Sequence, residues 1–241
     1  KRITAPWSSP TSFAAGRESA SRGISGTFRI MTTGSRIAWR KKSLPAITNG
    51  SRMISLREDD RTHIIYRKWE AHSPKAILLL VHGLGGHSAR WQFLADFFLK
   101  YDISSYAIEL KGFGRTKDLK GHIDSFGIYI DDIRRLHDII REECGNKKIF
   151  LAGESMGALI AYLVAIAHPK IFDGLVCISP AFQSRLNLGL SDYVKIFFSL
   201  IFNPRKQLTM PFGSNMCTRD TEYQKVMDSS EDEHRFATPK L

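Results

Sequence analysis

The sequence predicts an α/β fold with a doubly wound, mostly parallel sheet. Short apolar runs that end at Gly or a turn alternate with segments whose apolar residues recur at helical spacing. A chain that alternates strands with helices in this way pairs its strands in parallel. The 241 residues are 43% hydrophobic and 24% charged, which is enough for one sizeable core.

The elements follow one another from Met53 onward. The first two strands are joined by a turn-prone Asp-Asp-Arg-Thr segment, and the third is a continuous apolar run typical of a buried parallel strand. Ser125 is expected to cap an amphipathic helix that ends at Gly145. Phe93, Phe97 and Phe98 have the spacing of core residues. Strands are expected at 53–59, 63–71, 75–83, 103–110, 147–155 and 172–180, and helices at 89–101, 125–145 and 156–168.

The positive charge is concentrated at the start of the chain. Residues 1–52 hold ten Lys or Arg and one Glu, whereas residues 53–241 hold 25 Lys or Arg and 23 Asp or Glu. The first segment is also rich in Ser, Thr, Gly and Ala, so we expect a disordered basic tail, which resembles a transit peptide or upstream sequence that is not translated. It has no recognisable nucleic-acid-binding motif, so nucleic acid is not an expected partner.

Three cysteines, Cys144, Cys177 and Cys217, form no CxxC pair and leave an odd count. This pattern favours a reducing compartment and argues against a disulfide framework or a zinc site. Apolar stretches are shorter than the ~20 residues of a membrane span. We therefore expect a cytoplasmic protein without metal or other cofactor.

The segment Gly153-Glu154-Ser155-Met156-Gly157 is expected to be a tight turn between a buried strand and a helix. Such a corner holds the Ser hydroxyl above the sheet edge, and the two glycines allow close backbone approach. Ser155 is thus the candidate nucleophile. The alternative is a turn in which Ser155 only caps the helix.

A Gly-rich loop, His82-Gly83-Leu84-Gly85-Gly86-His87, follows the third strand. Such a loop leaves backbone N–H groups free to face a ligand, as an oxyanion hole requires. Leu84 N–H and Met156 N–H are the expected donor pair. A phosphate-binding loop is the alternative, but neither phosphate-loop glycine motif is present.

From about Met53 to Leu241 the chain resembles the serine hydrolases of the α/β-hydrolase fold, in the monoacylglycerol lipase and lysophospholipase group, also called the serine aminopeptidase S33 type. The resemblance rests on HGLGGHSARW, IELKGFGRT, GHIDSFGIYIDDI, GESMGALIA and HPKIFDGLVCISPA in the family's order. The chain departs from the pattern at Glu154, where the family commonly has His, and at ELKGFGRT, where it commonly has Asp-x-Arg-Gly-His-Gly-x-Ser.

The resemblance implies a triad in the chain order Ser, acid, His. After Ser155 the chain offers His168, expected to end a helix, and His234, in a charged stretch. Neither is expected to be the base. Asp173 precedes its strand, and Asp192 and Asp220 fall in the cap that the resemblance implies.

The resemblance therefore places the acid, the base and the last core strands beyond Leu241. The chain, which starts with Lys, is expected to be a fragment with little or no turnover and poor solubility. For the longer parent, the resemblance implies hydrolysis of a monoacylglycerol, a lysophospholipid or a similar ester.

The cap is expected at about 181–241. Its apolar segment Asp192–Pro204 either lies on a membrane or micelle surface or packs the cap onto the core. Two other functions stay open. One is acyl transfer or peptide hydrolysis on the same fold, and the other is a non-catalytic scaffold that binds a ligand or partner.

Overall fold

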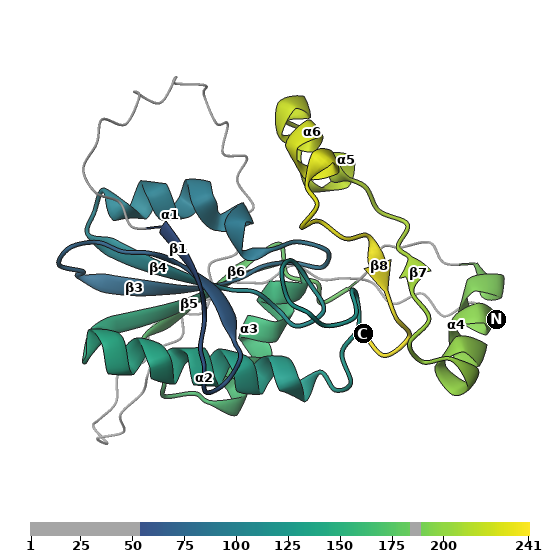
Figure 1. Ribbon diagram of the computed structural model, residues 1–241, viewed down its shortest axis with the longest axis horizontal. Helices are drawn as coiled ribbons and strands as arrows, with labels where there is room; N and C mark the ends of the chain where they lie inside the picture. The colour runs from purple at the N-terminus through teal and green to yellow at the C-terminus, as the bar shows by residue number, and fades with distance from the viewer. Residues whose placement is uncertain (1–53, 184–188) are drawn as a thin grey trace, which may run out of the picture.

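The computed structural model describes residues 54–183 and 189–241 (Figure 1). The expected basic tail, 1–52, lies outside these residues. The described chain forms a six-stranded sheet with the strand order β1-β2-β4-β3-β5-β6. The first two pairings are antiparallel, and the pairings among β4, β3, β5 and β6 are parallel. The prediction of a mostly parallel α/β sheet is confirmed.

The strands of the large sheet begin and end close to the expected positions. The third strand is a continuous apolar run, as the sequence pattern indicated, whereas the first two mix apolar with charged residues. The strands are β1 Ile54–Glu58, β2 Ile65–Trp69, β3 Ala76–Val81, β4 Ile103–Ile108, β5 Lys148–Glu154 and β6 Gly174–Ile178.

Three helices cover the two faces of this sheet. A short 3-10 turn, η1 (Ser88–Trp91), leads into α1 (Gln92–Leu99) on one face, and α2 (Gly127–Cys144) and α3 (Met156–Ala167) lie on the other (Figure 1). Gly145 ends α2 with φ 64°, as expected. The N-cap of α2 is Phe126, not Ser125. The Ser125 hydroxyl instead accepts a hydrogen bond from Gly127 N–H at 3.3 Å.

The core lies on both faces of β3 because successive side chains of a strand point to opposite sides. Ile77, Leu79 and Val81 are fully buried on the side of α2 and α3. Leu80 is buried on the other side with Trp91 of η1 and other residues. Full burial of one such side chain contributes about 2 kcal/mol to folding.

The prediction that Phe93 and Phe97 belong to this core is wrong. Their side chains are 66% and 51% exposed, while Ala95 between them is fully buried. Helical spacing identifies a shared face of α1, but the face that packs on the sheet carries Ala95 and the partly buried Leu94 and Leu99.

The register brings the carboxyl ends of the parallel strands to one edge. Val81 pairs with both Ile108 and Gly153, and Glu154 pairs with Ile178. The loops after β3, β4, β5 and β6 therefore start side by side. In an open α/β sheet this edge is where ligands bind.

Residues 189–241 lie beyond this edge (Figure 1). They form three helices and a two-stranded antiparallel sheet. The elements are α4 Leu190–Phe202, β7 Leu208–Thr209, α5 Ser214–Cys217, α6 Thr221–Ser229 and β8 Phe236–Ala237. We call residues 189–241 the cap.

Strand β6 forms an edge of the large sheet as the structure describes it. Cys177 faces α3, with its thiol 3.7 Å from the Ala158 carbonyl oxygen. Val176 and Ile178, on the other face, are 44% and 39% exposed. An edge strand with exposed β-branched side chains is a template for pairing with another chain.

We therefore expect the 241-residue chain to self-associate through β6 and Val176→Lys to raise its monomer fraction. A lysine on an edge strand opposes pairing because its charge must stay solvated. Size-exclusion chromatography with light scattering measures the effect. Val226→Lys is the control, because Val226 is exposed on α6 rather than on a strand. A monodisperse unmodified chain would contradict the expectation.

Candidate active site

Ser155 occupies the single position between β5, which ends at Glu154, and α3, which begins at Met156. Its backbone has φ 53° and ψ −119°, a region that costs a non-Gly residue of order 1–3 kcal/mol. Backbone hydrogen bonds hold it there. Ser155 N–H donates to Ile178 O at 2.9 Å, and Ser155 O accepts from Ala181 N–H at 3.1 Å.

The glycines on either side of Ser155 are required by close backbone contact. A Cβ on Gly157 would collide with the carbonyl oxygens of Val81 and His82, and a Cβ on Gly153 would collide with the carbonyl oxygen of Gly157. The N-terminus of α3 thus packs directly on the end of β3. This contact fixes the corner next to the loop that follows β3.

The His-Gly loop lies against this corner. A Cβ on Gly83 would be 3.2 Å from Ser155 Cβ and 3.0 Å from Glu154 Oε1. Among the residues that the structure describes, neither Leu84 N–H nor Met156 N–H has a hydrogen-bond acceptor. Leu84 belongs to the loop that lies next to Ser155, and Met156 directly follows Ser155 in the chain.

His82 is fully buried and links two loops. Its Nδ1–H donates to Gly83 O at 2.8 Å, and its Nε2 accepts from Leu110 N–H at 3.1 Å. A carbonyl only accepts and an amide only donates, so these partners require the neutral ring. Burial lowers the pKa of His82 to about 4, and Glu109 opposes this effect only in part.

Glu109 was not among the predicted site residues, although it lies in the segment that departs from the family pattern. Its carboxylate is almost fully buried and accepts from Ser88 N–H and from Arg115 N–H, both at 2.9 Å. One carboxylate therefore ties the loop after β3 to the loop after β4. An acidic residue at the end of a buried strand was the available signal.

Glu154 belongs to a charge cluster with Arg90 and Glu233 of the cap. Arg90 Nη1 lies 3.5 Å from Glu154 Oε1, while Arg90 Nε and Nη2 donate to the two oxygens of Glu233 at 2.5 and 2.8 Å. Burial raises the pKa of Glu154 above its ordinary value, and the Arg90 guanidinium offsets only part of this. Sequence could not reveal this cluster because Arg90 and Glu233 lie far apart in the chain.

The two histidines that follow Ser155 do not bond to its hydroxyl. His168 ends α3, a helix whose N-terminus is at Ser155, so the length of the helix separates the two residues. His234 is half-buried, not exposed as the sequence around it suggested. Its backbone N–H donates to Gly85 O at 2.9 Å. Within residues 54–183 and 189–241, no hydrogen bond joins Ser155 Oγ to either ring.

The three aspartates considered from the sequence all accept hydrogen bonds from backbone N–H groups. Asp173 accepts from Ile149 N–H at 2.8 Å, at the start of β5 and thus at the sheet edge opposite Ser155. Asp192 accepts from Gly189 N–H at 3.1 Å at the start of α4. Asp220 is the N-cap of α6. Each carboxylate satisfies backbone donors that would otherwise lack a partner.

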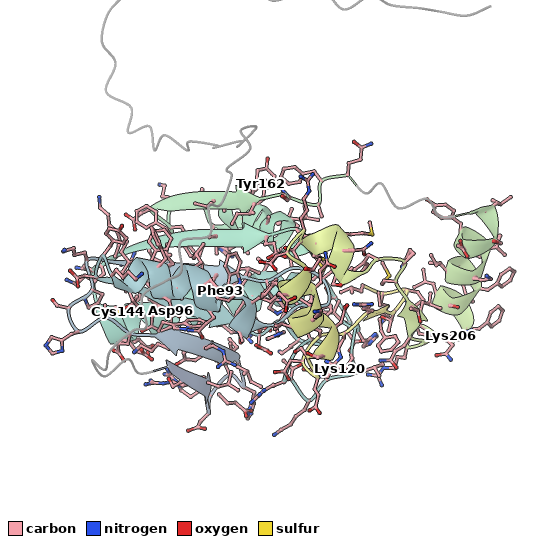
Figure 2. The ribbon with its side chains drawn as sticks, turned by 90° about the horizontal axis from the view of Figure 1, so that it is seen from above. Phe93, Asp96, Lys120, Cys144, Tyr162 and Lys206 are labelled. Atoms are coloured by element: carbon pink, nitrogen blue, oxygen red, sulfur yellow. The ribbon has the colours of Figure 1, made fainter. Side chains whose placement is uncertain are left out.

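A cavity of about 240 Å³ lies beside the Ser155 corner, between α1 and the cap helices. Figure 2 shows Phe93 next to the cap helices, and its ring packs edge-on against Tyr223 at 5.9 Å. Glu154, directly before Ser155, is part of the wall. The lining residues are Arg90, Phe93, Glu154, Cys217, Thr218, Tyr223 and Met227.

The described part of the chain holds no cluster of three or more His, Cys, Asp or Glu side chains arranged to bind a metal ion. A mostly parallel sheet with a Ser corner after β5, a Gly-rich loop after β3 and a helical cap beyond the same edge defines an α/β-hydrolase.

Comparison with known proteins gives the family. Residues 72–241 match the model of the Hydrolase_4 family, described as serine aminopeptidase, S33. The chain belongs to this family.

Two curated relatives are similar to part of the chain. The chain is 32% identical to mouse monoglyceride lipase over 122 residues, which cover 50% of this chain and 40% of the mouse protein. It is 30% identical to the phospholipase YtpA of Bacillus subtilis over 126 residues, covering 51% of this chain and 48% of that protein. The matched part is thus about half of each relative or less.

Among solved structures, the fold resembles a soluble variant of monoglyceride lipase from Saccharomyces cerevisiae in complex with a substrate analogue. The TM-score is 0.66 at 17% identity, covering 81% of this chain and 67% of the yeast chain. At this identity the likeness supports the fold alone.

Acidification is expected to destabilise the fold through His82. Its folded pKa of about 4 lies below the ordinary 6.5, so the unfolded chain binds more protons between these pH values. The stability that neutral His82 contributes is therefore fully present above pH 6.5 and is lost as the pH falls toward 4. The expected loss is about 3 kcal/mol.

Urea unfolding at a series of pH values measures this loss, and His82→Gln should flatten the dependence. His72→Gln, at an exposed position, is the control and should keep the slope of the unmodified chain. Equal slopes for all three proteins would show that His82 makes no such contribution. Should His82→Gln not fold, nitrogen NMR of His82 in the unmodified chain reports its titration directly.

Proposed function

We propose that this chain belongs to a serine ester hydrolase in which Ser155 is the nucleophile. The observation that carries the proposal is the backbone of Ser155, held at φ 53° between a strand and a helix. A strained conformation of this kind persists only where surrounding contacts enforce it, and it is concentrated at functional sites. The monoglyceride lipase and phospholipase relatives support a carboxylic ester of a lipid as substrate.

In the proposed reaction Ser155 Oγ attacks the ester carbonyl carbon, and the hydroxyl proton passes to a base. The N–H groups of Leu84 and Met156 stabilise the oxyanion of the tetrahedral intermediate. The C–O bond to the alcohol then breaks, and the alcohol leaves with the proton from the base. Water then attacks the acyl carbonyl carbon and gives a proton to the base, the C–O bond to Ser155 Oγ breaks, and Oγ takes this proton back as the fatty acid leaves.

Within the described residues, no side chain that could act as the base is hydrogen-bonded to the Ser155 hydroxyl. A hydroxyl without such a base is a poor nucleophile. This observation favours a second candidate function for the 241-residue chain taken by itself. In that case the chain is a scaffold that binds a lipid ester without hydrolysing it.

The two functions differ in the effect of Ser155→Ala. In the protein translated from the complete reading frame, the substitution should reduce monoacylglycerol and short-chain ester hydrolysis by more than about 10³-fold. In the 241-residue chain, both the unmodified protein and the variant should show little turnover. Fatty acid release measures the rates.

Equal rates for the variant and the unmodified complete protein would contradict the role of Ser155. Acyl-enzyme on the Ser155 peptide, trapped from the complete protein and seen by mass spectrometry, would support the covalent step. If the complete protein has no ester hydrolase activity but retains lipid binding, the scaffold function replaces the enzyme.

We also propose that α4 contacts the lipid surface on which the substrate lies. Its apolar side chains are exposed instead of packing the cap onto the core: Leu190 is 82% exposed and Phe202 is 77% exposed. Exposed basic residues, Arg205 and Lys206, follow the helix, and Figure 2 shows Lys206 at the end of the molecule beside it. Exposed apolar side chains next to basic groups suit an anionic lipid surface.

No helix in the described residues combines the length and the apolar character that crossing a bilayer needs. The contact that we propose for α4 is interfacial. This contact buries α4 in the head-group region of the lipid surface. The loops at the carboxyl edge of the sheet still face the cap.

Replacing Phe198 and Phe202, whose rings stack at 6.1 Å, by Ser should weaken vesicle binding. Burial of one Phe side chain contributes about 2 kcal/mol, so the double variant should bind at least roughly tenfold more weakly. Sedimentation with vesicles that contain phosphatidylserine measures the affinity. Val226→Ser, at an exposed apolar position on α6, is the control, and an equal loss for both proteins would argue against α4.

A further inference from the structure

We propose that Glu154 selects the head group of the substrate: the cavity beside Ser155 takes an uncharged, hydroxyl-bearing group and rejects a phosphate. This inference rests on the proposed function and deepens it, because a monoacylglycerol and a lysophospholipid differ at this part of the molecule. It assigns a specificity-determining role to the residue at which the chain departs from the family pattern.

Glu154 is placed where it can contact the head group of the substrate. It precedes Ser155 directly and lines the 240 Å³ cavity, so a group in that cavity lies next to the reacting ester. Its side chain is 35% exposed, which leaves the carboxylate accessible from the cavity. A carboxylate accepts hydrogen bonds from hydroxyl groups and repels an anion.

The charged groups at the cavity disfavour a second anion. Arg90 is the one Lys or Arg among the lining residues, and its Nε and Nη2 are already bonded to both oxygens of Glu233. The same guanidinium lies 3.5 Å from Glu154. Two carboxylates therefore share one cation, and a phosphate would enter a site with surplus negative charge.

The hydrogen-bonding groups of the cavity suit an uncharged head group that carries hydroxyl groups. Tyr223 and Thr218 provide hydroxyl groups, and Glu154 provides acceptor oxygens. A small polyol offers matching donors and acceptors without carrying charge. The rings of Phe93 and Tyr223 could also attract a quaternary ammonium group, but Arg90 in the same wall opposes a cation.

The test compares three non-hydrolysable probes by isothermal titration calorimetry at neutral pH and low salt. They are an octyl glyceryl ether, the same ether with a phosphate on its terminal hydroxyl, and the same ether with a trimethylammonium group there. The ether bond removes any dependence on turnover, and the short chain keeps the probes monomeric. The proteins are the 241-residue chain, Glu154→Gln and Glu142→Gln.

Glu142→Gln is the matched control because it removes the same charge from an exposed position near the end of α2. For the unmodified chain and this control, the uncharged ether should bind roughly tenfold more tightly than its phosphate. This ratio is the scale for like charges a few ångströms apart at a partly exposed site. Glu154→Gln should bring the two affinities within about twofold.

A salt series on the unmodified chain gives a second measurement that does not depend on the variant folding. High ionic strength should reduce the preference for the uncharged ether, because screening weakens the repulsion of the phosphate. A purely steric rejection would not change with salt.

Equal binding of the uncharged ether and its phosphate by the unmodified chain would overturn the role of Glu154 and leave the proposed ester site intact. Tightest binding of the trimethylammonium probe would overturn it in favour of a cationic head group. If none of the probes binds, the proposed lipid ester site itself fails, and the inference fails with it.

Discussion

The close contact between the N-terminus of α3 and the end of β3 governs the geometry of the site. Gly157 packs against the carbonyl oxygens of Val81 and His82, and Gly153 packs against Gly157. Because neither glycine carries a side chain, α3 packs directly on the end of β3, and the chain turns from β5 into α3 within one residue. Ser155 occupies that residue with φ 53°, and the first turn of α3 then lies beside the loop that holds Leu84.

Two buried polar side chains hold the loops after β3 and β4 in place next to Ser155. His82 bonds to backbone on both the loop after β3 and the loop after β4, and Glu109 bonds to Ser88 and Arg115 on the same two loops. Buried polar groups are costly unless they are paired, so each of these contacts constrains both loops. The segment that departs from the family pattern therefore still supplies a residue that holds the loops together.

Sequence predicted the features that depend on neighbours in the chain. The strands, the turn at Ser155 and the end of α2 at Gly145 follow from local patterns of apolar residues and glycine. Exposure of Phe93 and Phe97 was predicted wrongly, because spacing on a helix does not reveal what covers it. The partners of Arg90 and the half-buried position of His234 depend on cap residues far along the chain, so no local pattern could reveal them.

The contacts of the last cap segment show why cap and site cannot be considered separately. Glu233 binds Arg90, His234 N–H binds Gly85 O, and Thr238 N–H binds Gly121 O at 2.7 Å. These anchors are all on loops at the carboxyl edge of the sheet. Arg90 joins this anchoring to Glu154 and hence to the residue before Ser155. A cap held by the same guanidinium that balances Glu154 sets both the shape and the charge of the cavity, so a change in cap position must alter the electrostatic environment beside Ser155.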